Sequence, residues 1–114
     1  MSERSSGLLL GDLLDSCSKI LSYTEGISFE DFIQDSKTLD AVIRNFEIIG
    51  EAANRLPHEF KDLHSDIDWH KMRGLRNRVI HHYFGIDYAI VWEIVTAYIP
   101  PLLSKLKSIK TNTR

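Results

Sequence analysis

Cysteine, proline and long apolar runs are scarce in this chain of 114 residues. A single cysteine, Cys17, allows neither an internal disulfide nor a zinc site built from several cysteines, and it fits a reducing compartment. The longest uninterrupted apolar run is five residues, from Tyr88 to Trp92, whereas a transmembrane helix needs about 20 mostly apolar residues. The N-terminus has no signal-peptide pattern. We therefore expect no membrane-spanning segment and a cytoplasmic protein.

Composition places the chain among globular proteins, since 43% of its residues are hydrophobic and 26% are charged. These values exclude disorder or low complexity as a description of the whole chain. The length suits one domain, residues 1–114, in which we expect 1–6 and 108–114 to be flexible.

The net charge of −2 hides an uneven distribution. Residues 1–68 hold 14 of the 16 acidic residues, and residues 69–114 hold 8 of the 14 basic ones. No acidic residue lies between Trp69 and Phe84. Two interpretations stay open: the basic segment binds an anionic partner, or it packs against the acidic half of the chain.

Apolar residues recur at spacings of three and four along most of the chain, which predicts helices. We expect long helices over 9–21, 36–55, 69–85 and 87–106, and short ones near 29–34 and 60–63, the last anchored by Phe60 and Leu63. Gly85 should end the third long helix in a left-handed cap, and Pro100-Pro101 should kink or split the fourth. The predicted fold is all-α, an up-and-down bundle of four main helices. Its wide apolar faces favour a homodimer.

The densest polar chemistry lies between Arg73 and Gly85. This segment combines guanidinium groups, an amide, imidazoles and a phenol. Guanidinium binds phosphate bidentately, and imidazole exchanges protons near neutral pH. These groups suit RNA cleavage without a metal, in which a base removes the 2′-OH proton, a cation stabilises the phosphorane and an acid protonates the leaving oxygen.

A regular helix limits this chemistry. Arg73, Asn77 and His81 share one face, but Arg76 lies about 140° around the helix from His81. Two arrangements would bring Arg76 and His81 to one phosphate: the helix ends or distorts near His81, or two copies of the chain share the site across a two-fold axis. The alternative without catalysis is a solvated basic face with a histidine at a helix C-terminus.

Two other groups of polar residues are weaker candidates. Glu47 and Glu51 lie four residues apart on one predicted helix, and could be an acid–base pair or, more simply, a salt-bridged face that supports the basic segment. If Glu51 faces Arg76 or Arg73, it would orient that guanidinium. The histidines His58, His64 and His70 recur every six residues, which is not a same-face metal spacing, so we expect no metal site.

The segment Arg76-Asn77-x-x-x-His81 resembles the R-polar-x(3)-H motif of ribonucleases of the HEPN superfamily. Extended to Tyr83, it resembles the R-x(4)-H-x-Y form of HepT-like toxins from HepT/MntA toxin–antitoxin pairs. Further similarity lies in Arg44-Asn-Phe-Glu-Ile-Ile-Gly-Glu51-Ala, in Asp68-Trp69 and in Gly85-Ile-Asp87. The resemblance covers the chain from about Leu8 to Leu106.

This resemblance implies a HEPN bundle of four or five helices that forms a homodimer with a composite cleft. Arg76 and His81 would be the catalytic pair of a metal-independent endoribonuclease without a cofactor, and Asn77 would support them. Arg73 and Glu51 are further supporting candidates. Tyr83 would be the hydroxyl that the partner nucleotidyltransferase, MntA, modifies with AMP, which places charge and bulk where the RNA phosphate must lie.

Two other functions remain open. The chain could be a non-catalytic subunit that docks a nucleotidyltransferase and helps bind its nucleotide or substrate. It could also be a helical dimer without activity. Toxicity on expression alone, relieved by the partner, would favour the ribonuclease, and harmless expression would favour the docking subunit.

Overall fold

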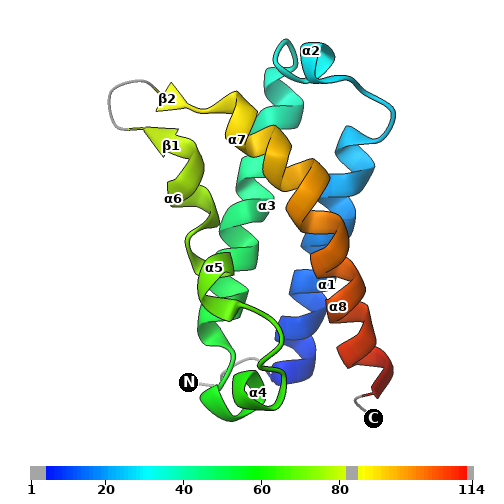
Figure 1. Cartoon of the computed structure of the whole chain (residues 1–114), viewed down its shortest axis with the longest axis vertical. Helices are drawn as coiled ribbons and strands as arrows, with labels where there is room; N and C mark the ends of the chain where they lie inside the picture. The colour runs from blue at the N-terminus through cyan, green and yellow to red at the C-terminus, as the bar shows by residue number, and fades with distance from the viewer. Residues whose placement is uncertain (1–4, 82–84, 113–114) are drawn as a thin grey trace.

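Four helical columns run alternately up and down in the computed structural model, which describes residues 5–81 and 85–112 (Figure 1). The columns are α1 (Ser6–Thr24), α3 (Ser36–Arg55), the pair α5 (Trp69–Arg73) and α6 (Leu75–Val79), and a final column of α7 (Tyr88–Glu93), η1 (Ile94–Tyr98) and α8 (Ile99–Asn112). Two short helices, α2 (Phe29–Phe32) and α4 (His58–Leu63), lie in the connections. The all-α, up-and-down bundle predicted from the sequence is confirmed.

Three of the helices start at side-chain caps that the sequence predicts, Ser28, Asp68 and Asp87. Ser28 and Asp31 form a reciprocal capping box at α2. Asp68 accepts a hydrogen bond from the amide of Lys71 at 3.0 Å, and Asp87 accepts one from the amide of Ile90 at 3.1 Å. These carboxylates satisfy amide groups that have no partner within the helix.

The core lies among all four columns, and α3 contacts both α1 and the pair of α5 and α6. Its fully buried large side chains come from every column and include Leu13, Ile20, Phe46, Ile49, Met72, Leu75, Ile94, Ile99 and Leu106. Cys17 is also fully buried, as predicted, and burial raises the pKa of its thiol to about 12. Leu63 differs from the prediction, because its side chain is 79% exposed. Only Phe60 anchors α4, through ring contacts with His64 and Trp69.

The final column contains the irregularity that the sequence predicts at Pro100-Pro101. It also bears on the prediction that the chain has no membrane-spanning helix. A π-helical turn, η1, precedes Pro100-Pro101, which lie in the first turn of α8 and have no amide hydrogen to continue the α-helical bonding of the turn before them. By length and composition the helix from Tyr88 to Ile109 could cross a membrane, contrary to the sequence prediction. The sequence analysis missed this helix because it considered only uninterrupted apolar runs. The mean hydropathy of a helix stays high even where isolated polar residues interrupt such a run. Seven of its apolar side chains lie in the core of the bundle: Val91, Ile94, Val95, Ile99, Leu102, Leu106 and Ile109.

The helix predicted from Trp69 to Gly85 is wrong in two places. It divides at Gly74, and it ends at Val79 rather than at Gly85. A two-stranded antiparallel hairpin follows, in which β1 (Ile80–His81) pairs with β2 (Gly85–Ile86). Gly85 does have a positive φ of 78°, but in the hairpin rather than at a helix end. The amide of Asp87 donates to the carbonyl of Val79 at 2.7 Å and so satisfies the end of α6.

Candidate functional site

The site is built on α6 and the hairpin that follows it. Arg76 lies within α6, and His81 lies in β1, beyond the end of the helix. The helix therefore ends before His81, and the angle that separates these two residues on a regular helix does not apply. The structure describes the backbone of His81 but not its side chain. Tyr83 lies outside the described residues.

Arg76 contacts a carboxylate of α3. Its Nε lies 2.8 Å from Oε2 of Glu47, and the other oxygen of Glu47 lies 3.8 Å from a terminal nitrogen of Arg44. The side chain of Arg76 is 48% exposed, so the contact does not remove its guanidinium from solvent. One carboxylate thus lies between two arginines that come from different parts of the chain.

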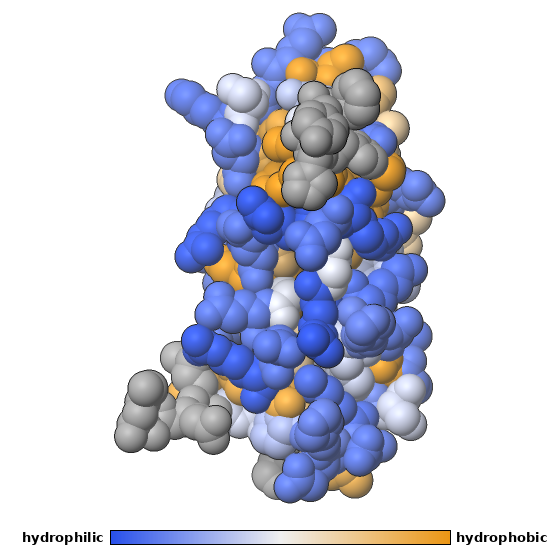
Figure 2. Space-filling view, turned by 90° about the vertical axis from the view of Figure 1, so that its left-hand side faces the viewer, coloured by the Kyte–Doolittle hydropathy of each residue, from blue (hydrophilic) through white to orange (hydrophobic). Residues whose placement is uncertain are grey.

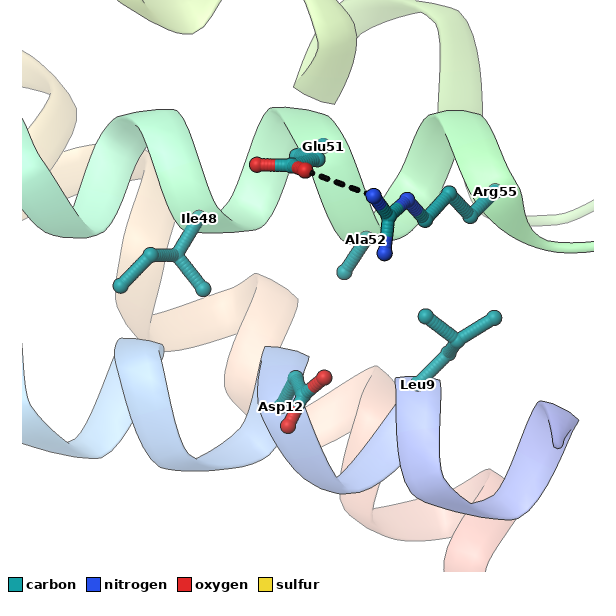
Figure 3. Close-up of a pocket in the computed structure, with 6 residues that line it drawn as sticks. All are labelled: Leu9, Asp12, Ile48, Glu51, Ala52 and Arg55. Atoms are coloured by element: carbon teal, nitrogen blue, oxygen red, sulfur yellow. Dashed lines mark ion pairs between the residues drawn. The ribbon is translucent and has the colours of Figure 1, made fainter. Parts of the chain in front are cut away.

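Glu51 has a different partner. Its Oε1 lies 3.1 Å from Nη2 of Arg55, one turn further along α3. Figure 3 shows both side chains at a pocket of about 160 Å³ between α1 and α3, opposite Asp12 and Leu9. The carboxylate that contacts Arg76 is therefore Glu47, whereas Glu51 was the candidate from the sequence.

Among the other basic residues between Trp69 and Phe84, one has a contact within the fold and two are exposed. Lys71 lies 5.0 Å from the ring centre of Tyr98, which gives it a cation–π contact within the fold. Arg73 and Arg78 are exposed, and within residues 5–80 and 85–109 neither has an ion pair. Burial and the nearby charge of Arg73 lower the pKa of Lys61. The basic segment is thus only partly neutralised by the acidic half of the chain.

Asn77 follows Arg76 on α6, and its side chain is exposed. Arg73, Arg76 and Asn77 are all exposed on the column of α5 and α6, which forms one flank of the bundle (Figure 1). Figure 2 shows that flank, which is mostly hydrophilic with hydrophobic residues gathered toward its upper end. Within the described residues no cluster of three metal-ligating side chains occurs.

The family described as Ribonuclease HepT-like matches residues 13–109, most of the chain and all of the site. The chain belongs to the HepT-like ribonuclease family. A Thermococcus cleftensis protein named as a probable ribonuclease HepT is 43% identical over 101 residues, which cover 89% of this chain and 92% of that protein. A candidate RNase of Caldanaerobacter subterraneus is 42% identical over 88% of this chain and 89% of its own length.

A third relative, a candidate RNase of Methanocaldococcus jannaschii, is 37% identical over 96% of this chain and over its whole length. No solved structure matches the chain. The HepT-like family and the helical architecture agree on an all-α HEPN-type bundle, as predicted from the sequence.

Two features of this HepT-like site escaped the sequence analysis. The hairpin was missed because its strands have two residues each, although β-branched Val79-Ile80 and the later Gly85-Ile86 are its signal. The sequence analysis expected the acidic face of Glu47 and Glu51 to support the basic segment, but it named Glu51 and not Glu47 as the partner of Arg76, a contact between residues 29 positions apart. Periodicity gave the face of α3 but not which of its two carboxylates meets the arginine.

Proposed function

We propose that this HepT-like protein is a metal-independent endoribonuclease, with Arg76 and His81 as its catalytic pair in a cleft between two copies of the chain. The observation that carries the proposal is the end of α6 at Val79, so that the backbone of His81 lies in β1, beyond the helix that carries the half-exposed Arg76. Asn77 and Arg73 support the pair, because they add a polar group and a cation to the same flank.

The chemistry is a transfer of the phosphodiester to the neighbouring 2′ oxygen. One imidazole of His81 removes the 2′-OH proton, the 2′ oxygen attacks phosphorus, and the bond to the 5′ oxygen breaks. The 5′ oxygen takes a proton from the second His81 of the dimer. Arg76 stabilises the negative charge of the phosphorane. The products are a 2′,3′-cyclic phosphate and a 5′-OH end.

The test is RNA cleavage in the presence of EDTA by the purified protein and by His81→Ala and Arg76→Ala. We expect each substitution to lower the rate by about 100-fold or more. Circular dichroism and thermal unfolding should match wild type, because the side chain of Arg76 is 48% exposed and His81 lies outside the helices that form the core. Cleavage that persists in both variants, or activity that falls only with stability, would contradict the proposal.

We further propose that the chain is the toxin of a two-gene module and acts in the cytoplasm. Its partner would be a nucleotidyltransferase of the MntA type that transfers AMP to Tyr83. Tyr83 is two residues beyond His81, so an adenylyl group there would bring a phosphate and a large base next to the cleavage site and compete with RNA.

Co-expression with such a nucleotidyltransferase tests this regulation. We expect toxicity on expression alone, relief by the partner, and an added mass of one AMP on intact protein. Tyr83→Phe should remain toxic in the presence of the partner and gain no mass. Harmless expression of unmodified, folded protein would instead support a docking subunit without catalysis.

A further inference from the structure

The contact between Glu47 and Arg76 has a geometry that matters for phosphate binding. A guanidinium has one N–H donor on Nε and four on its two terminal nitrogens. Glu47 approaches from the Nε side, at 2.8 Å. The opposite edge, formed by the two terminal nitrogens, is the edge that binds a phosphate bidentately, and the 48% exposure of the side chain leaves room for it.

The backbone fixes the distance between the two elements that carry this pair. An added Cβ at Gly50 would lie 3.2 Å from the carbonyl oxygen of Met72 and 3.3 Å from that of Arg73. Gly50 follows Glu47 by one turn, and Arg73 precedes Arg76 by one turn. The contact of Gly50 with Arg73 and the contact of Glu47 with Arg76 therefore lie next to each other between two antiparallel segments. Close packing of the backbone, and not the side chains alone, sets the position of Glu47 relative to α6.

The charge around Glu47 remains favourable for an anion. Arg44 and Arg76 lie on either side of its single carboxylate, at 3.8 and 2.8 Å, so the group of three carries a net positive charge. A phosphate can therefore approach Arg76 although a carboxylate is bound to the same guanidinium.

We infer that Glu47 is a positioning residue for Arg76, which holds Nε so that the terminal nitrogens meet the phosphate as cleavage proceeds. This inference rests on the proposed ribonuclease function and adds a residue to it. Glu47 touches neither RNA nor the reacting atoms in this arrangement, and it acts through the arginine.

The test separates kcat from KM for Glu47→Ala and Glu47→Gln. We expect Glu47→Ala to lower kcat by about 10- to 100-fold, since a misplaced catalytic group costs that much. KM should stay constant or fall, because a negative charge near the phosphate is removed. Glu47→Gln keeps an oxygen that accepts from Nε and should recover most of kcat. A purely structural role of Glu47 would produce no such rescue and no such split.

The control is Asp15→Ala, which removes a carboxylate from another exposed ion pair, 3.1 Å from Lys19 on α1. We expect wild-type kinetics for it. Both pairs are exposed and contribute little to stability, so all variants should fold, which circular dichroism checks. If Glu47→Ala does not fold, Glu47→Leu, which keeps the bulk of the side chain but has no oxygen that accepts from Nε, replaces it in the comparison with Glu47→Gln.

Two results would overturn the inference while leaving the proposed function intact. One is wild-type kcat in Glu47→Ala, and the other is a Gln variant as slow as the Ala variant. If the wild-type protein itself does not cleave RNA, the proposed function fails and the positioning role fails with it.

Discussion

Gly50 is the position where one methyl group should disturb the site most. A Cβ there would meet two backbone carbonyls at 3.2 and 3.3 Å, and backbone cannot rotate away as a side chain does. Alanine gains about 1 kcal/mol of helix propensity, but overpacking costs about 1–3 kcal/mol. We expect Gly50→Ala to lower the free energy of unfolding by about 1 kcal/mol, measured by urea denaturation.

Gly11 in α1 is the matched control. A Cβ added at Gly11 would have no heavy atom within 4 Å, so only the propensity and unfolded-chain terms apply. Gly11→Ala should therefore raise the free energy of unfolding by about 0.4–1 kcal/mol. Stabilisation by both substitutions would show that α5 can shift to accommodate the added methyl group. It would contradict the view that rigid packing fixes the position of Glu47 relative to Arg76.

The helix that leads into the site depends on Asp68. Its carboxylate accepts from the amide of Lys71 at the start of α5, and the sequence offers no other cap there. We expect Asp68→Ala to cost about 1 kcal/mol of stability, and Asp68→Asn to cost much less, because the amide oxygen still accepts the bond. Denaturant midpoints with an unchanged m-value would measure this. Equal losses in the two variants would show that the charge, rather than the cap, is what stabilises.

Helix boundaries that depend on local chemistry were predictable from the sequence. The ends of α3 and the caps at Ser28, Asp68 and Asp87 follow from side chains a few residues apart. The end of α6 was not predictable in this way. Its apolar stripe continues in register through Val79, so periodicity favours a longer helix, and the hairpin that replaces it is closed by the distant amide of Asp87.

For the candidate site, the sequence supplied the residues but not their contacts. Chemical type directed attention to the segment from Arg73 to Gly85, but the pairing of Arg76 with His81 came from the resemblance to HEPN ribonucleases, and the family match agrees with the ribonuclease class. The register between α3 and the column of α5 and α6 decides which carboxylate of α3 contacts Arg76. A shift of one turn would bring Glu51 rather than Glu47 to Arg76, and the close approach of Gly50 to the carbonyls of Met72 and Arg73 is one contact that fixes the observed register.

The uneven charge of the whole molecule predicts how it binds RNA. The overall charge is −2, yet Arg73 and Arg78 remain exposed without an ion pair among the described side chains. Binding of single-stranded RNA should therefore be local and salt-dependent. We expect Arg73→Ala, in an inactive His81→Ala background, to reduce the slope of log K against log salt by about 0.7, the value for one phosphate. Fluorescence anisotropy over a salt series measures it.

Lys19→Ala is the comparison for that measurement, because Lys19 is paired with Asp15 on α1, away from α5 and α6. Its slope should equal that of the background variant. An unchanged slope in the Arg73 variant would mean that this arginine does not neutralise a phosphate, and the RNA would have to follow another path across the molecule.

Dimerisation should control activity, because the proposed chemistry needs two proton transfers by imidazole and each chain supplies one His81. A monomer would offer one His81, which would have to serve as both base and acid. We expect light scattering to give a dimer, and specific activity to fall when dilution separates the copies. Cleavage and mass should be measured at the same protein concentrations. A monomer that retains full specific activity would require another proton donor within the same chain, and would move the cleft from the interface to one protomer.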